Sequence, residues 1–302
     1  MIINKTLRQA IAAYKVGKFE EAEHFFLEIL KVEPKNIDAN HNLGVLKVSM
    51  NQSAAAIPLF KTATEINPNI VQFWVSYAGA LINEKKFEEA ELSCRKAIEL
   101  KPDYAEAHNS LGFILYNQAR YEECEIVYKK AIELRPDYPE AFNNLAIVYY
   151  DLVKYDAAEV SYKKAIELRP NYAEAYNNLG NTLNKIGKFE DAVVCLKKAI
   201  DLKPKLAEAH NNLGHTLKNL NRLNESEVSY QKYISLNSDF VAIAYHINKG
   251  DWKISKNLLD IMCIKKIFDT KRNIKEFISL WCLYCGKLLA NGDIKKFSQI
   301  FI

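Results

Sequence analysis

Six of the eight prolines in this 302-residue sequence are separated by equal intervals of 34 residues. They are Pro34, Pro68, Pro102, Pro136, Pro170 and Pro204. Five equal gaps do not arise by chance, and a fixed period of this length is the signature of a repeat protein. The proline spacing therefore predicts one quasi-linear array of repeats rather than two ordinary globular domains.

Residues 105–138 illustrate what one repeat builds. Apolar residues recur at helical spacing over residues 105–118 and again over 121–134, which predicts two helices. Pro136 has no backbone N–H with which to continue the second helix, so it marks the end of that helix. Each repeat is therefore predicted to be a helix–turn–helix unit.

Polar residues precede each predicted first helix. Asp103 with Glu106, and Asp137 with Glu140, have the spacing of a capping box. The second position of the repeat is acidic in five copies, which are Asp38, Glu106, Glu140, Glu174 and Glu208, and Gln72 in another. These acids also predict that one edge of the first helices is negatively charged. This edge would favour an extended neutral-to-basic ligand.

Two positions of the repeat are small in every copy. Counting Ala105 as position one, position eight holds Ala10, Gly44, Ala78, Gly112, Ala146, Gly180 and Gly214. Position twenty holds Ala22, Ala56, Ala90, Cys124, Ala158, Ala192 and Ser226. Paired helices approach closely only where the residues between them are small, so these positions predict the helix–helix contact.

This pattern resembles the tetratricopeptide repeat (TPR) family. The matching residues in one repeat are Leu111, Gly112, Tyr121, Tyr128, Ala131 and Pro136, with Cys124 where the family prefers alanine. Seven such repeats occupy residues 3–240. The resemblance implies an all-α fold, a right-handed superhelical solenoid of antiparallel helix pairs whose first helices line a concave groove.

The remaining residues, 241–302, have no proline and a different character. Turn-like residues there predict two degenerate helical hairpins that close the array, unless the sequence is the front part of a longer polypeptide. This segment contains 11 Lys and Arg against 5 Asp and Glu, so it alone accounts for the positive net charge of the chain, which is +4. A solvated helix face is the simplest explanation.

Catalytic and metal-binding motifs are absent from the sequence. Cys282 and Cys285 form a CxxC in the middle of a predicted helix, where they fit buried packing better than zinc or redox chemistry. We therefore expect no enzyme activity, no cofactor and no metal site. No apolar run is long enough for a membrane span and no signal peptide is visible, so a cytoplasmic location is expected. Basic residues are not interleaved with exposed aromatic residues, which argues against nucleic acid as a partner.

Asparagines gather at two neighbouring positions of the first helices. Position six holds Asn42, Ser76, Ser110, Asn144, Asn178 and Asn212, and position five holds Asn109, Asn143, Asn177 and Asn211. A side-chain amide offers both a donor and an acceptor, which are the groups that a peptide backbone needs. These residues are therefore candidates for binding an extended peptide. The alternative is that they only solvate or cap the helix.

The Asn-Asn-Leu-Gly segments are similar to the TPR region of protein O-linked N-acetylglucosamine transferases. In that family an asparagine ladder at position six binds substrate peptides, and the matching residues here are Asn42, Asn144, Asn178 and Asn212. The resemblance leaves two functions open. One is a non-enzymatic protein-interaction scaffold, and the other is the substrate-recognition region of a TPR-containing glycosyltransferase whose catalytic domain is absent from this chain.

Overall fold

The computed structural model describes residues 2–236, which form fourteen α-helices and no strand. The first helices of the pairs are α1 (Ile2–Lys15), α3 (Ile37–Ser49), α5 (Val71–Asn83), α7 (Ala105–Asn117), α9 (Pro139–Asp151), α11 (Ala173–Lys185) and α13 (Ala207–Asn219). The second helices are α2 (Phe19–Val32), α4 (Ser53–Ile66), α6 (Phe87–Leu100), α8 (Tyr121–Leu134), α10 (Tyr155–Leu168), α12 (Phe189–Leu202) and α14 (Leu223–Leu236). The predicted all-α fold is confirmed. The hairpins predicted for residues 241–302, with Cys282 and Cys285, lie outside the described residues.

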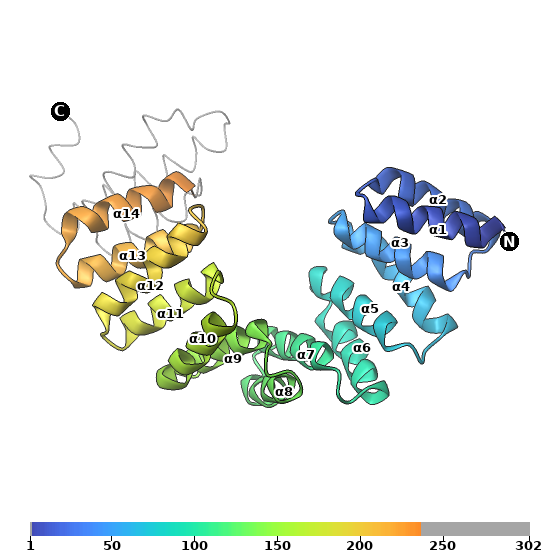
Figure 1. The fold of residues 1–302 in the computed structure, drawn as a ribbon. Helices are drawn as coiled ribbons and strands as arrows, with labels where there is room; N and C mark the ends of the chain where they lie inside the picture. Colours follow the sequence, from blue (N-terminus) through green and yellow to red (C-terminus); the bar gives the residue numbers. More distant parts are fainter. Residues whose placement is uncertain (1, 237–302) are drawn as a thin grey trace, which may run out of the picture. The chain divides into compact units, whose positions relative to one another are not determined.

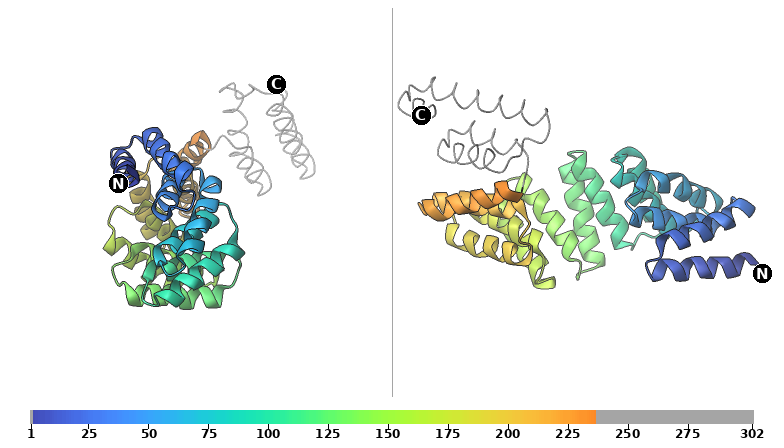
Figure 2. Two further views of the ribbon diagram at one scale, coloured as in Figure 1. Left: turned by 90° about the vertical axis from the view of Figure 1, so that its right-hand side faces the viewer. Right: turned by 90° about the horizontal axis from the view of Figure 1, so that it is seen from above.

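The chain forms two compact blocks, an N-terminal block (Met1–Arg169) and a C-terminal block (Pro170–Ile302). The N-terminal block contains α1 to α10, and the described part of the C-terminal block contains α11 to α14. Within each block a first helix packs against its own second helix, which in turn packs against the next first helix (Figure 1). Figure 2 shows the same pairing from two further directions.

The turn inside each pair has the same backbone geometry in all seven pairs. Its central residue has a positive φ in every case, and these residues are Gly17, Asn51, Lys85, Ala119, Val153, Gly187 and Asn221. In the fifth pair Lys154 N donates to Tyr149 O at 2.8 Å and Val153 N donates to Tyr150 O at 3.0 Å. This is a Schellman motif, which satisfies the last carbonyls of the first helix and requires a left-handed residue. Two of the seven positions use glycine, which is the residue best suited to them.

The ends of the helices follow the sequence in part. Arg135, which precedes Pro136, is extended (φ −138°, ψ 92°), as the proline ring requires, and α8 ends one residue earlier. The predicted capping boxes are wrong. The residues preceding α7 and α9 are Tyr104 and Tyr138, and neither makes a side-chain cap hydrogen bond.

The small residues at position eight lie directly beneath a large side chain of the paired helix. A Cβ atom added to Gly112 would lie 2.6 Å from Tyr128 Cε1, and one added to Gly180 would lie 2.6 Å from Leu196 Cγ. Such distances are far inside van der Waals contact, so these helices can approach only because glycine has no side chain. All seven residues at position twenty are buried as well. The predicted helix–helix contact is confirmed.

The side chain at position four of the repeat forms a hydrogen bond to the loop that precedes the first helix. In four repeats a side-chain N–H donates to the proline carbonyl six residues earlier. These pairs are Asn40–Pro34 at 2.9 Å, Trp74–Pro68 at 2.7 Å, His108–Pro102 at 2.9 Å and His210–Pro204 at 3.1 Å. A carbonyl only accepts hydrogen bonds, so Nε2 of His108 and of His210 carries the proton. Both histidines thus have a structural role.

Candidate functional site

The predicted asparagines form hydrogen bonds from one repeat to the next. In the N-terminal block Asn144 Nδ2 donates to Asn109 Oδ1 at 3.2 Å. In the C-terminal block Asn212 Nδ2 donates to Asn177 Oδ1 at 2.9 Å. In both pairs the partners are 35 residues apart, so position six of one repeat contacts position five of the preceding repeat. We call these cross-repeat bonds the amide ladder.

Neighbouring amides of the same helix also bond to each other. Asn143 Nδ2 lies 3.4 Å from Asn144 Oδ1, and Asn177 Nδ2 lies 3.3 Å from Asn178 Oδ1. Asn143 and Asn177 are buried, whereas their neighbours at position six are half-buried. Position five therefore supports the ladder from below, and position six is its more accessible edge.

The other predicted residues differ in whether they make a cross-repeat bond. Asn42 Nδ2 donates to the backbone carbonyl of Asp38 in its own helix at 2.8 Å, which fits the alternative that this asparagine only serves its own helix. Ser76 stands where other repeats have asparagine, and it makes a similar cross-repeat bond. Its Oγ lies 3.0 Å from Nε2 of His41, which is 35 residues earlier. Asn211 Oδ1 is buried and has no hydrogen-bond partner. Ser110 makes no hydrogen bond of its side chain within the described residues.

A second row of cross-repeat bonds lies about two helical turns further along the first helices. Tyr116 donates its hydroxyl to Asp151 Oδ2 at 2.6 Å in the N-terminal block. Asn219 Nδ2 donates to Asn184 Oδ1 at 3.0 Å in the C-terminal block. These pairs are also 35 residues apart, but they join positions twelve and thirteen. None of these four residues was predicted from the sequence as a candidate site residue.

The acids at position two are paired with cations from their own repeats. Glu106 forms an ion pair with Arg135, Glu140 with Arg169, and Glu174 with Lys203 at 2.8 Å. Burial is the largest single influence and would raise the pKa of Glu106. The hydrogen bonds from Arg135 and from the backbone N–H of Glu106, together with the charges of Arg135 and Lys101, outweigh it, so the pKa lies below its ordinary value. The predicted negative edge is therefore largely neutralised at these three repeats.

Repeat-family models match the chain at several segments. Models described as "TPR repeat" or "Tetratricopeptide repeat" match residues 37–70, 80–118, 120–153, 139–172, 161–194, 180–221 and 207–240. Together these segments cover well over half of the chain. The chain belongs to the tetratricopeptide repeat family. No curated protein sequence matches it.

Solved TPR structures share this fold at low sequence identity. A tetratricopeptide repeat protein from Parabacteroides merdae has a TM-score of 0.67 and 16% identity, covering 85% of this chain and 98% of its own. Cut9–Hcn1 of the APC/C has a TM-score of 0.68 and 14% identity, covering 83% of this chain and 48% of its own. YrrB, described as "a TPR protein with an unusual peptide-binding site", has a TM-score of 0.50 and 23% identity, covering 61% of this chain and 94% of its own. These identities establish the TPR fold and nothing finer.

Of the three cysteines in the described residues, Cys94 and Cys124 are buried and Cys195 is half-buried. Burial raises the pKa of the Cys94 thiol and of the Cys124 thiol to about 12, so neither is a thiolate at neutral pH. The residues that the structure describes contain no cluster of three or more metal-ligating side chains. Among the same residues, no helix is long and apolar enough to cross a membrane.

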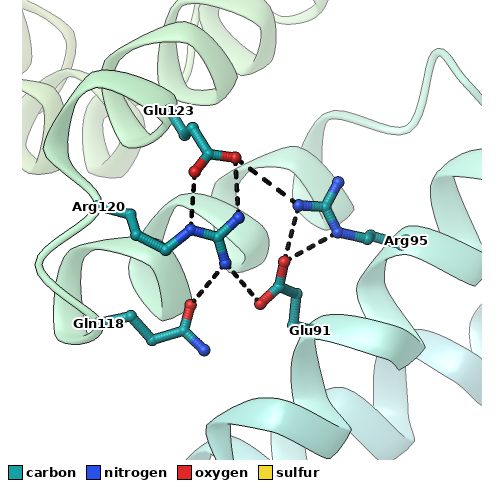
Figure 3. Close-up of polar contacts among 5 residues, drawn as sticks. All are labelled: Glu91, Arg95, Gln118, Arg120 and Glu123. Carbon is teal, nitrogen blue, oxygen red and sulfur yellow. Dashed lines mark hydrogen bonds and ion pairs between the residues drawn. The ribbon is translucent and has the colours of Figure 1, made fainter.

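A network of ion pairs and hydrogen bonds joins α6 to the α7–α8 turn and to α8, and so connects two neighbouring TPRs (Figure 3). Glu91 receives hydrogen bonds from Arg95 at 2.7 Å and from Arg120, in the next repeat, at 2.8 Å. Arg120 also bonds Glu123 and Gln118. Burial acts to raise the pKa of Glu91, but the two arginines outweigh it and lower the pKa below its ordinary value. This network is structural and lies apart from the amide ladder.

Proposed function

We propose that this TPR protein is a non-enzymatic scaffold that binds an extended segment of a partner protein along its first helices. The amide ladder carries this proposal. The amides that join Asn144 to Asn109 and Asn212 to Asn177 have the donors and acceptors that a peptide backbone needs. A helix face built only for solvation needs no such bonds between repeats.

The geometry of the ladder supports binding that depends little on sequence. Position six is half-buried in α3, α5, α7, α9, α11 and α13, and for Asn144 and Asn212 a partner at position five holds the amide in one orientation. A preorganised amide loses little side-chain entropy when a ligand binds. A row of such groups favours main-chain contacts, and any preference for ligand side chains must come from neighbouring positions.

An affinity capture from cell extract tests this proposal. The wild-type chain is compared with the triple variant Asn144→Ala, Asn178→Ala and Asn212→Ala, and bound proteins are identified by mass spectrometry. A matched control carries Glu99→Ala, Glu133→Ala and Glu167→Ala, which remove exposed side chains from three second helices. We expect the ladder variant to lose the partners that the wild type and the control both retain. An unchanged set of partners in a folded ladder variant would refute the role of the ladder.

A second candidate function is substrate recognition for a glycosyltransferase. Asparagine at position six in four repeats favours it, because O-linked N-acetylglucosamine transferases use this position for substrate peptides. Immunoblotting of the endogenous protein separates the two, since the 302 residues alone have a mass of 34.6 kDa. A much larger native mass together with transfer from a UDP-sugar would favour the glycosyltransferase. A native mass near 34.6 kDa without transfer would favour the scaffold.

A further inference from the structure

Position nine of the first helices lies between the two rows of cross-repeat bonds. It follows positions five and six by one helical turn and precedes positions twelve and thirteen by one more turn, so all these positions share one face. On α7 the residue at position nine is Phe113, between Asn109 of the amide ladder and Tyr116 of the second row. A ligand lying along the ladder would therefore meet the Phe113 side chain.

Phe113 is unusual in its exposure. Its accessible fraction is 40%, and among the described residues it is the only exposed large apolar side chain inside a first helix. A single exposed apolar residue is common on protein surfaces and is not a site by itself. The neighbouring helix must therefore be considered.

The equivalent position of α5, the preceding first helix, is Gly79, so position nine of that helix has no side chain. A Cβ atom added to Gly79 would meet no heavy atom within 4 Å, so the space beside it is open. Helices α5 and α7 are in contact. The position-six residues of the same two helices are Ser76 and Ser110, which are smaller than the asparagines of other repeats. Four small or exposed residues thus leave room where the asparagine sequence is interrupted.

Positions five, six and nine of the first helices around Phe113 have no formal charge, and the second row beyond them contains Asp151, whose Oδ2 accepts a hydrogen bond from the Tyr116 hydroxyl. Positions five, six and nine of α3, α5, α7 and α9 are His41, Asn42, Val45, Val75, Ser76, Gly79, Asn109, Ser110, Phe113, Asn143, Asn144 and Ile147. Burial lowers the pKa of His41 below its ordinary value, so this histidine is neutral at neutral pH. In the C-terminal block position nine is polar instead, with Asn181 and His215. An uncharged surface matches an uncharged ligand, because burying an unpaired charge against it is unfavourable.

We propose that the N-terminal block binds an uncharged extended peptide that places one bulky apolar side chain on Phe113, in the open space beside Gly79. This inference rests on the proposed peptide-binding function and adds the chemistry of the preferred ligand. The apolar side chain gains burial against the ring, and the flanking peptide groups bond to the amide ladder.

A peptide array tests the preference directly. The probes are immobilised 12-residue peptides of alanine, serine and glutamine with blocked ends, in which one central residue is Leu, Phe, Ala, Glu or Lys. The labelled 302-residue chain should bind the Leu and Phe peptides about tenfold more tightly than the Ala, Glu and Lys peptides, as expected for burial of one large side chain.

Two variants locate the preference. Gly79→Leu fills the open space, and Phe113→Ala removes the ring; each should reduce the tenfold preference to less than about twofold. Gly79 lies within a helix and in open space, so Gly79→Leu should fold, which its thermal unfolding verifies. Ile126→Ala is the matched control, because it removes an apolar side chain that is 67% exposed on the second helix α8. It should retain the full preference.

The outcomes separate the two proposals. If the wild type binds all peptides equally, or if folded Gly79→Leu and Phe113→Ala retain the preference, the inference about Phe113 is wrong and the peptide-binding function stands. If the wild type binds none of the peptides, the proposed function fails and the inference fails with it.

Discussion

Asn144 donates a hydrogen bond from Nδ2 to Oδ1 of Asn109, and the two residues lie 35 positions apart in a chain whose repeat is 34. The extra residue shows that successive first helices are offset, so each repeat contacts the next through neighbouring rather than equivalent positions. The same offset recurs between Asn212 and Asn177 and between Tyr116 and Asp151. Polar side chains on the first helices thus form hydrogen bonds that hold neighbouring repeats in this offset arrangement.

The ladder bond should contribute to stability as well as to binding. Asn144→Ala removes the donor to the side-chain Oδ1 of the half-buried Asn109. We expect a loss of about 1 kcal/mol in the free energy of unfolding. Asn42→Ala is the control, because its amide returns to its own helix and its loss should be smaller. Urea unfolding followed by circular dichroism measures both. Equal effects of the two substitutions would show that the cross-repeat bond adds nothing to stability.

The glycine beneath Tyr128 predicts a strong steric effect. Gly112→Ala places a Cβ 2.6 Å from the Tyr128 ring, and overpacking of this kind should destabilise the protein by about 1–3 kcal/mol. Gly79→Ala is the opposite case, because its Cβ enters open space and alanine favours the helix by about 0.5–1 kcal/mol. Thermal unfolding of the two variants should therefore shift in opposite directions. A shift in the same direction would contradict the packing described for Gly112.

The turn inside the fifth helix pair is strained. Val153 has a φ of 61° and its side chain is 66% exposed, so it contributes little burial in return for the unfavourable backbone conformation. Val153→Gly should raise stability by about 0.5–1 kcal/mol, because relief of the left-handed strain exceeds the entropy that glycine adds to the unfolded chain. The reciprocal change Gly187→Val, at a φ of 79°, should lower stability. Urea midpoints of the two variants would reveal an error in this assignment if they moved together.

Periodicity alone predicted much of the fold. The helices, the proline-terminated second helix and the small contact positions around Gly112 follow from spacing, because they depend on residues close in sequence or on a strict repeat. The capping boxes failed because the tyrosines Tyr104 and Tyr138 occupy the cap position, and Glu106 instead binds Arg135, 29 residues away.

The candidate site was predicted less completely, because its bonds join residues that are far apart in the sequence. Spacing placed Asn144, Asn178 and Asn212 on one face, but the 35-residue offset depends on how whole helices pack and not on local pattern. Two hydrogen bonds were not predicted, because neither involves the asparagines that marked the ladder. One joins Tyr116 to Asp151, and the other joins the His108 side chain to the Pro102 backbone carbonyl. The space beside Gly79 could be recognised only once the neighbouring atoms were placed.

The network around Glu91 predicts a defined loss of stability in acid (Figure 3). The Glu91 side chain is 15% exposed, and hydrogen bonds from Arg95 and Arg120 hold its pKa below the ordinary value of 4.5. A carboxyl group whose folded-state pKa is lowered stabilises the folded state above the unfolded-state pKa, and this contribution is lost as the pH falls through the folded-state pKa. The Glu91 contribution should therefore be complete at pH 7 and disappear progressively below about pH 4.5.

Glu91→Gln tests this contribution, because the amide keeps the shape and removes the charge. We expect a loss of about 1–3 kcal/mol at pH 7, since two arginines lose their common anionic partner. The difference from the wild type should shrink as the pH falls below about 4.5, because Glu91 itself becomes protonated as the pH falls through its lowered pKa. Glu99→Gln is the control, because its pair with Lys96 is exposed and contributes little at any pH. Urea midpoints at pH 7, 4.5 and 3 decide the matter, and a constant difference between Glu91→Gln and the wild type across that range would show that the carboxylate charge is not what joins α6 to the following repeat.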